Sequence, residues 1–472
     1  MITKILIANR GEIAVRIVRA CQEAGIESVA IYADADQHAL HVRKADEAYN
    51  IGPDPVAGYL NAHRIVNLAV ATGCDAIHPG YGFLSENPGF AEICARRGIK
   101  FIGPDADVIR KMGNKIEARR SMIAAGVPVV PGSDSSLTSL QEAVALANNI
   151  GYPVMLKATS GGGGRGIRRC NSEPELRRNY DRVLSEVQKA FGSADIFLEA
   201  CVDRPRHIEV QILADELGNV VHLFERDCSI QRRHQKLIEI APSPQLNDQQ
   251  RELICNYAVR AAQAVGYQNA GTVEFLLDKD NNFYFMEMNT RLQVEHTVTE
   301  TITGIDIVRE QFRIASGLRL SFSQDKIQRR GYAMQFRINA EDPKNDFLPS
   351  FGKITRYFAP GGPGVRTDAA IYTGYTIPPY YDSMCAKITV WALEWDELLN
   401  RAYRALHDTG VYGVKTTIPY YLEVLKVDSF RSGDFDTGFV EDHPQLVKYK
   451  TSPPARELAA VIAAVVAAHS GY

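Results

Sequence analysis

The sequence lacks the features of a secreted, membrane-spanning or nucleic-acid-binding protein. Its 472 residues carry a net charge of −3, which provides no basic surface for nucleic acid or lipid headgroups. Its 8 cysteines include no CxxC pair and no zinc spacing, as is typical of reduced thiols. The N-terminus has no signal-peptide core, and the apolar run at 458–468 is too short to cross a bilayer. We therefore expect a soluble, cytoplasmic protein that binds neither nucleic acid nor membrane.

The composition, 45% hydrophobic and 23% charged, is ordinary for a globular protein, and the length suits roughly three domains. Residues 1–110 alternate short apolar strands with helices, which predicts a parallel sheet covered by helices on both faces. Asn9-Arg10-Gly11, after the first strand, has one of the three glycines of a dinucleotide-binding fingerprint. The pattern therefore predicts a Rossmann-like fold and not that cofactor.

The most informative stretch is a predicted hairpin, in which strands 272–277 and 283–288 flank the turn sequence DKDNN. We expect the pairing to place Glu274 opposite Glu287, where two like charges are destabilising without a cation. Asn289, on the same side of its strand, would add a third oxygen. Such a site suits Mg²⁺ or Mn²⁺. The alternative, two solvated glutamates paired with lysines, is disfavoured by the polar run that follows.

That polar run alternates with period two. Arg291, Gln293 and Glu295 would share one face of an extended chain, next to the two glutamates. A metal site followed by a cation, an amide and a carboxylate is typical of a reaction centre.

Other segments carry groups that suit phosphates. The glycines at 161–164 join two predicted strands, which counts against a Rossmann loop, and the absence of Gly-Lys followed by Ser or Thr excludes a Walker loop. Such a glycine loop suits backbone N–H donors to phosphate; the alternative is a flexible hairpin loop. Lys157 precedes these glycines and would bring a positive charge to the same phosphates. Lys115 opens a helix whose N-terminus attracts anions. Without the other motifs, Lys115 would be interpreted as a surface lysine. Residues 227–236 are dense in cations without interleaved aromatics, and we interpret them as an anion site and not an RNA-binding segment. The alternation at 207–211 is typical of a half-exposed strand.

The last third has a different pattern. Polar residues alternate over 335–339, strands are predicted near 371–376 and 384–391, and a helix is predicted over 397–407. This predicts a compact α+β domain, followed by an amphipathic helix within 453–472.

Together these motifs resemble biotin carboxylase. With Lys115, the matching segments are KATSGGGGRG (157–166), RHIEVQ (206–211), ERDCSIQRRHQK (225–236), MEMNTRLQVEH (286–296) and RINAEDP (337–343). The resemblance extends to about residue 445 and implies an ATP-grasp fold of α/β and α+β parts. Its implied divisions are a Rossmann-like domain (1–113), a nucleotide-clamping domain (114–330) with a mobile lid (about 131–203), a C-terminal domain (331–446) and a helical tail (447–472).

The resemblance also implies the chemistry: a carbon–nitrogen ligase that carboxylates biotin with ATP and bicarbonate through carboxyphosphate. The metal ligands would be Glu274, Glu287 and Asn289. The ATP site would comprise Lys115, Lys157, Gly162, Gly163, Gly164, Glu199, Val202, His207, Gln231, His234 and Leu276. Bicarbonate would contact Lys236, Arg291, Gln293, Val294 and Glu295, and biotin would contact Tyr81, Gly82 and Arg337. The catalytic set would be Glu295 as general base, Arg337 stabilising the biotin enolate, Arg291 and Lys236.

The chain shows no biotinyl-lysine motif and no length for a carboxyltransferase, so we expect it to act on biotin carried by a separate carrier or carboxyltransferase subunit. The resemblance implies a homodimer through Arg19 and Glu23. Three positions depart from the family pattern: Pro363 replaces a packing aromatic, Ala200 a lysine and Thr297 a proline.

The final carboxyl acceptor is the least determined feature. Residues 435–446 and the tail resemble the ATP-binding subunit of two-subunit pyruvate carboxylases, which implies conversion of pyruvate to oxaloacetate. Acetyl-CoA and 2-oxoglutarate carboxylase subunits are the alternatives for the acceptor. For the function as a whole, the alternatives are another ATP-grasp ligase and an ATP-binding protein without turnover. The stoichiometry, the regulation and the role of the tail are open.

Overall fold

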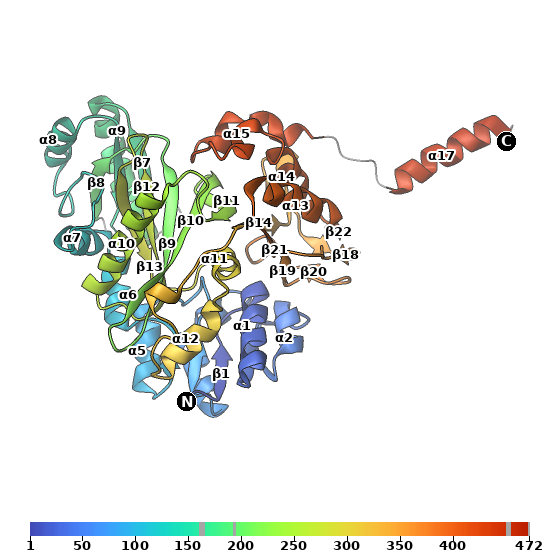
Figure 1. The fold of residues 1–472 in the computed structure, drawn as a ribbon, viewed down its shortest axis with the longest axis horizontal. Coiled ribbons are helices and arrows are strands. Elements are labelled where there is room, and N and C mark those ends of the chain that lie inside the picture. The colour runs from blue at the N-terminus through green and yellow to red at the C-terminus, as the bar shows by residue number, and fades with distance from the viewer. Residues whose placement is uncertain (160–165, 192–194, 450–454, 471–472) are drawn as a thin grey trace.

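The computed structural model describes residues 1–159, 166–191, 195–449 and 455–470 (Figure 1). Its N-terminal part is the expected parallel sheet, five-stranded in the order β3-β2-β1-β4-β5. Ile5 and Ile7 of β1 pack into one core and Leu6 into another, so both faces of this strand are buried. Its elements are β1 Lys4–Ile7, α1 Gly11–Ala24, β2 Glu27–Tyr32, α2 Leu40–Lys44, β3 Glu47–Asn50, α3 Ala57–Leu60, α4 Ala62–Ala71, β4 Ala76–His78, α5 Pro88–Arg96, β5 Lys100–Phe101, α6 Ala106–Gly113 and α7 Lys115–Ala124.

A second sheet, antiparallel and eight-stranded, runs through the centre of the molecule in the order β13-β12-β9-β10-β11-β14-β21-β19. The pairing of β11 with β14 carries it across the expected domain division near residue 330, so the C-terminal part is continuous with the central one. Its strands are β9 Arg206–Ala214, β10 Val220–Arg232, β11 Gln235–Ala241, β12 Asn269–Leu277, β13 Phe283–Asn289, β14 Tyr332–Asn339, β19 Val365–Ala369 and β21 Met384–Ala392. Neighbouring helices are α10 Asp248–Ala264, α11 His296–Thr303, α12 Ile307–Ala315 and α13 Trp395–Asp408.

A third, three-stranded sheet, in the order β7-β6-β8, lies at one side of the molecule with a core of its own (Figure 1). It lies within the expected lid. Its elements are α8 Leu140–Ile150, β6 Val154–Ala158, β7 Ile167–Cys170, α9 Glu173–Phe191 and β8 Ile196–Ala200.

The predicted hairpin is present as β12 and β13, and Glu274 pairs with Glu287 as expected. The three pairs next to the turn are symmetric about residues 278–282 and would by themselves place Glu274 opposite Met286. A register shift between Glu274 and Phe275 moves the pairing by one residue. Because a bulge re-aims the side chains of the strand, it is this irregularity that brings the two carboxylates together.

The prediction of a strand near 371–376 is wrong. Only Thr376–Ile377 (β20) is extended there, because the chain turns at Gly374, whose φ is +96°. The strand of the sheet lies earlier, at β19, where Asp368 pairs with Lys387 of β21. The predicted helix 397–407 is confirmed as α13.

Short strands and helices complete the C-terminal part. The strand pairs are β15 Glu341–Asp342 with β16 Leu348–Pro349, β17 Gly352–Lys353 with β20, and β18 Arg356–Phe358 with β22 Gly410–Tyr412. The helices are α14 Ile418–Val424, α15 Asp428–Arg431, α16 Phe439–Asp442 and α17 Ala455–Ser470. Helix α17 extends away from the body (Figure 1). Within the described residues no helix is long and apolar enough to span a membrane.

His78 links β4 to the loop that follows it. The ring is fully buried, its Nδ1 accepts from the N–H of Gly80 at 3.0 Å, and its Nε2 lies 3.1 Å from Oε1 of Gln311. Only a neutral ring protonated at Nε2 satisfies both contacts. Burial accordingly lowers the pKa of His78 to about 4.

This burial predicts sensitivity to acid. The folded-state pKa lies below the unfolded value, so the stabilisation is complete above pH ~6.5 and decreases as the pH falls towards 4. Between pH 6.5 and 5, His78 should contribute a loss of about 2 kcal/mol of unfolding free energy. We expect His78→Gln to lose correspondingly less stability over this interval, measured by thermal unfolding at both pH values. His63→Gln, at an exposed histidine, is the control; equal pH dependence of the two variants would contradict the assignment.

Candidate active site

A cavity of about 1380 Å³ lies where the N-terminal loops, the central sheet and the C-terminal part meet. Every predicted site residue that the structure describes lines it, whereas Gly162, Gly163 and Gly164 lie outside the described residues. The residues it brings together are Tyr81, Gly82, Lys115, Lys157, Glu199, Val202, His207, Gln231, His234, Lys236, Glu274, Leu276, Glu287, Asn289, Arg291, Gln293, Val294, Glu295 and Arg337.

A row of charges crosses four adjacent strands beneath this cavity. Glu287 pairs with Glu274, Glu274 with Glu209, and Glu209 with Arg226. Glu209 and Arg226 are fully buried and form an ion pair, although the alternation at 207–211 predicted a half-exposed strand. Directly opposed like charges are destabilising, so the three glutamates require cations.

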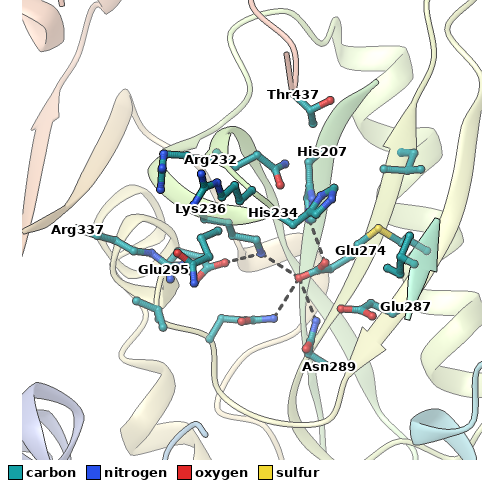
Figure 2. Close-up of a pocket in the computed structure, with 18 of the residues that line it drawn as sticks. His207, Arg232, His234, Lys236, Glu274, Glu287, Asn289, Glu295, Arg337 and Thr437 are labelled. Atoms are coloured by element: carbon teal, nitrogen blue, oxygen red, sulfur yellow. Dashed lines mark hydrogen bonds and ion pairs between the residues drawn. The ribbon is translucent and has the colours of Figure 1, made fainter. Parts of the chain in front are cut away.

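Lys236, at the start of β11, supplies the central cation (Figure 2). Its Nζ lies 2.5 Å from Glu209, 2.9 Å from Glu274 and 2.7 Å from Glu295. Burial would lower the pKa of Lys236, but the three carboxylates raise it well above its usual value. One ammonium therefore joins the predicted metal residues to the predicted base.

Glu295 is held ionised. Burial would raise its pKa, but Lys236 opposes this, and the net shift is downward. Arg337 of β14 adds a second cation, with Nη2 3.0 Å from Glu295 Oε2 and Nε 2.5 Å from Glu239. An ionised carboxylate held between two cations can accept a proton from a bound anion.

Neither Glu239 nor its link through Gln335 to Thr297 was predicted. Gln335 donates to Glu239 at 2.9 Å and accepts from the hydroxyl of Thr297 at 2.5 Å. Thr297, which departs from the family pattern, thus has a buried partner and supports the residues around Arg337. No sequence period indicated this link, since these residues are far apart in the chain.

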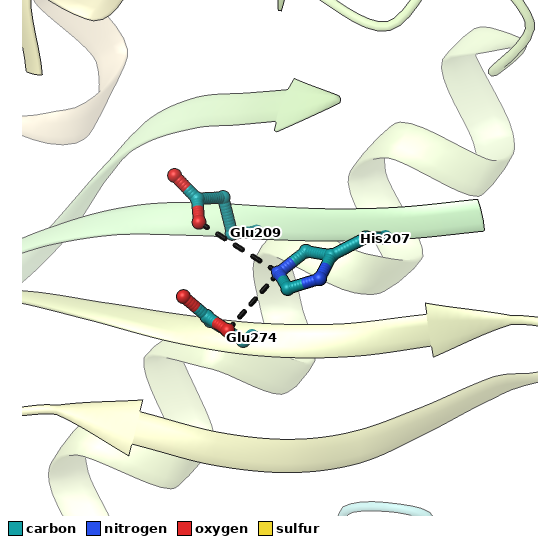
Figure 3. Close-up of side chains that lie close together, drawn as sticks. All are labelled: His207, Glu209 and Glu274. Carbon is teal, nitrogen blue, oxygen red and sulfur yellow. Dashed lines mark ion pairs between the residues drawn. The ribbon is translucent and has the colours of Figure 1, made fainter. Parts of the chain in front are cut away.

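The predicted metal site centres on Glu274. The Nε2 of His207 lies 3.0 Å from Glu274 Oε2 and 3.9 Å from Glu209 Oε2 (Figure 3). Burial would raise the pKa of Glu274, but Lys236 and His207 lower it well below its usual value. Asn289 donates to Glu274 at 3.0 Å, but its oxygen accepts from Arg291 at 3.0 Å, so ligation by Asn289 would require that bond to be replaced.

Glu287 differs from Glu274. Its side chain has no hydrogen bond or ion pair with another described residue, and burial together with the Glu274 charge raises its pKa. A half-buried carboxylate beside a buried one, in a set of oxygen donors, fits a hard divalent cation such as Mg²⁺. The residues present therefore fit the predicted ion.

Two further contacts at the cavity had no sequence signal. Arg291 donates to Glu86 Oε2 at 2.8 Å and to Gln293 Oε1 at 2.9 Å, so Glu86, from the loop before α5, orients the polar run. On the side of the cavity near Val202, Thr437 also lines the wall, and its N–H donates to the carbonyl of Pro205 at 3.0 Å.

Lys157 and Lys115 lie on the side of the cavity formed by the third sheet. Lys157 forms an ion pair with Glu199 across β6 and β8. Burial lowers the pKa of Lys115, and the charge of Glu287 opposes this shift. Both ammonium groups face carboxylates in a partly closed space, which is compatible with a phosphate-bearing ligand.

Three family models match consecutive parts of the chain. They are the biotin carboxylase N-terminal domain (residues 1–109), the ATP-binding domain of the carbamoyl-phosphate synthase L chain (114–323) and the biotin carboxylase C-terminal domain (335–442). The chain is also 53% identical over 471 residues to the 2-oxoglutarate carboxylase small subunit of Hydrogenobacter thermophilus, covering 100% of both. The chain belongs to the biotin carboxylase family. It is an ATP-dependent, ligase-type biotin carboxylase of a biotin-dependent carboxylase.

Other relatives are named as carboxylase subunits or domains. It is 53% identical over 444 residues to a pyruvate carboxylase subunit of Methanothermobacter thermautotrophicus, covering 94% of this chain and 90% of that one. A crystal structure of the biotin carboxylase domain dimer of Hydrogenobacter thermophilus 2-oxoglutarate carboxylase, in complex with MgADP, ADP and bicarbonate, superposes with a TM-score of 0.93. That chain is 54% identical, with 96% of this chain and 100% of that one covered.

The carboxylate pair predicts the metal dependence of this biotin carboxylase. Glu287→Gln preserves volume but removes one charge opposite Glu274. We expect the Mg²⁺ concentration for half-maximal ATP hydrolysis to rise by about tenfold, the equivalent of about 1.4 kcal/mol. The measurement is a magnesium titration at fixed ATP. Glu252→Gln, at an exposed position of α10, is the matched control, and a normal magnesium titration for Glu287→Gln would count against the facing-carboxylate site.

Proposed function

We propose that this biotin carboxylase carboxylates biotin on a separate carrier subunit with Mg·ATP and bicarbonate, and that the cavity residues take the roles implied by their motifs. The observation that carries the proposal is the position of the Glu295 carboxyl group, 2.7 Å from Lys236 and 3.0 Å from Arg337, in the cavity that also contains the Glu274–Glu287 pair. A base, two anion-binding cations and a metal site are what bicarbonate activation requires.

In this mechanism Glu295 accepts the proton of bicarbonate while Lys236 and Arg291 hold the anion against the γ-phosphate. Bicarbonate attacks that phosphate, giving carboxyphosphate and ADP. A Mg²⁺ ion on Glu274 and Glu287 would neutralise charge on the transferred phosphoryl group; Mn²⁺ suits the same oxygen donors. Carboxyphosphate yields CO₂ and phosphate beside biotin. The released phosphate takes the proton of the biotin ureido nitrogen, Arg337 stabilises the resulting enolate, and the enolate nitrogen attacks CO₂.

The final acceptor is, in our proposal, a 2-oxo acid, and first of all pyruvate, which becomes oxaloacetate. Residues 435–446, together with the likeness to the pyruvate carboxylase subunit over 94% of this chain, support pyruvate. 2-Oxoglutarate is the second candidate, because the 2-oxoglutarate carboxylase small subunit matches this chain over its whole length, tail included. Acetyl-CoA is a third. The partner that carries the carboxyltransferase would determine the choice.

We further propose a homodimer that acts in the cytoplasm. Arg19 and Glu23 lie on α1, where the Arg19 side chain is 42% exposed and 3.8 Å from Asp368. The related 2-oxoglutarate carboxylase domain is described as a dimer. All 8 cysteines are free, which is compatible with a reducing compartment.

Phosphate release tests the reaction class. We expect release from Mg·ATP to require bicarbonate and to increase when free biotin is added, because carboxyphosphate is consumed in the presence of the acceptor. In the presence of the partner subunit, pyruvate and 2-oxoglutarate are then compared as acceptors, with acetyl-CoA as the third. If biotin does not increase phosphate release but another amine or acid does, the biotin half-reaction is refuted.

The base is tested by Glu295→Gln. We expect the variant to bind ATP normally and to lose bicarbonate-dependent turnover by about a hundredfold or more, in the range of general-base contributions. Nucleotide binding and phosphate release are measured on the same preparation, so that misfolding is recognised. Turnover equal to that of the unmodified chain would eliminate Glu295 as the base.

A further inference from the structure

The ammonium of Lys387 contacts three segments of the active site. Lys387 lies on β21, and 0% of its side chain is exposed. Its Nζ donates to the carbonyl of Val294 at 2.8 Å and lies 3.1 Å from Glu12 Oε1. The same Nζ lies 5.9 Å from the centroid of the Tyr81 ring. These partners come from the segment before α11, the first turn of α1 and the loop after β4, and all three line the cavity.

Glu12 connects two of these partners. The Oε1 atom that faces Lys387 also accepts a hydrogen bond from the Tyr81 hydroxyl. Burial raises the pKa of Glu12, and the Lys387 charge opposes this shift. The other oxygen, Oε2, is buried without a hydrogen-bond partner among the residues that the structure describes. Glu12 therefore depends on Lys387 for the compensation of its charge.

The strand register directs Lys387 to this place. Lys387 pairs with Arg337 of β14 on one side and with Asp368 of β19 on the other. Directly paired residues point to the same face of a sheet. Arg337 reaches the carboxylate of Glu295, while Lys387 reaches the carbonyl of the preceding residue, Val294. Two cations on neighbouring strands thus hold successive residues of one segment.

We propose that Lys387 is a positioning residue for the carboxylation of biotin. It fixes the carbonyl of Val294, next to the base Glu295, and through Glu12 it fixes Tyr81 on the biotin side of the cavity. The proposal rests on the function proposed above for Glu295 and Tyr81. If Lys387 only stabilised the fold, its removal would lower the melting temperature and leave the KM values unchanged.

The test uses a variant that removes both charges. Lys387→Met alone leaves the Glu12 carboxylate buried without its cation, which destabilises the fold. Lys387→Met combined with Glu12→Gln removes both charges and keeps an acceptor oxygen for Tyr81, but it loses the donor to Val294. The matched control is Arg251→Met combined with Glu225→Gln, another buried pair, with Nε 2.8 Å from Oε1, whose residues are outside the cavity lining.

We expect the double variant to raise the KM for bicarbonate about tenfold, with the KM for Mg·ATP within about twofold of normal, while the control changes neither. Binding gives an independent readout. With Mg·ADP present, added bicarbonate should raise the thermal unfolding midpoint of the unmodified chain and of the control, but not that of the double variant at the same concentration.

Glu12→Gln alone separates the two contacts. It removes the ion-pair partner of the buried Lys387 ammonium but leaves it the carbonyl of Val294 and an amide oxygen at position 12, so the melting temperature is measured with the KM values. It keeps the ammonium on Val294, so the KM for bicarbonate should stay within about twofold while the KM for biotin rises. A tenfold rise in the bicarbonate KM of Glu12→Gln would overturn the proposal. So would a double variant that binds and uses bicarbonate as the control does.

Failure of the proposed function gives a different result. In that case the unmodified chain shows no biotin-stimulated phosphate release. A bicarbonate-induced shift of its unfolding midpoint that the double variant lacks would still support the positioning of Val294 by Lys387.

Discussion

The compensation of buried carboxylates is the constraint on which the rest of this site depends. Three glutamates stand side by side on adjacent strands, Glu287, Glu274 and Glu209, and a buried charge without a partner costs several kcal/mol. Lys236 contacts two of them and also Glu295. Because one ammonium serves three carboxylates, none of these side chains can move independently. Among the described residues the Glu287 side chain has no ion pair, although the charge of Lys115 acts on it, and this is the position where a divalent ion has most to contribute.

The eight-stranded sheet is what makes this arrangement rigid. Glu287, Glu274 and Lys236 come from the strands before residue 330, whereas Arg337 comes from β14, yet all lie on one continuous sheet. A site divided between two packed domains would be exposed to hinge motion at their boundary. Here the backbone pairing of β11 with β14 holds Arg337 in place relative to Lys236 and the carboxylates around it. The nucleotide side is different, since Lys157 and Glu199 lie on a separate three-stranded sheet with its own core.

The sequence predicted the parts of the site that depend on local pattern. The hairpin, the polar run after it and the parallel N-terminal sheet follow from periodicity within short segments, and the family motifs supplied the list of cavity residues. Contacts between distant segments had no such signal: Glu86 reaches Arg291, and Thr437 joins the wall near Val202. The prediction of a strand at 371–376 failed because the buried residues Ile371 and Tyr375 belong to a turn that packs into the core. The polar face at 207–211 was misjudged because its neutralising partner, Arg226, lies on the next strand.

The position of the third sheet is anchored where its last strand leaves it. After β8, Arg204 pairs with Asp436 at 3.0 Å and also with Asp442, and Arg206 donates to the carbonyl of Phe435 at 2.7 Å. These contacts attach the chain between β8 and β9 to the C-terminal part beside Thr437. A movement of the three-stranded sheet relative to the large sheet would therefore pivot about a point held by residues from the end of the chain. Lys157 would move with it, whereas Glu274, Glu287 and Lys236 would stay in place. The groups proposed for the metal and the anion thus lie on one continuous sheet, whereas Lys157 and Glu199, proposed for the nucleotide, lie on a separate sheet with its own core.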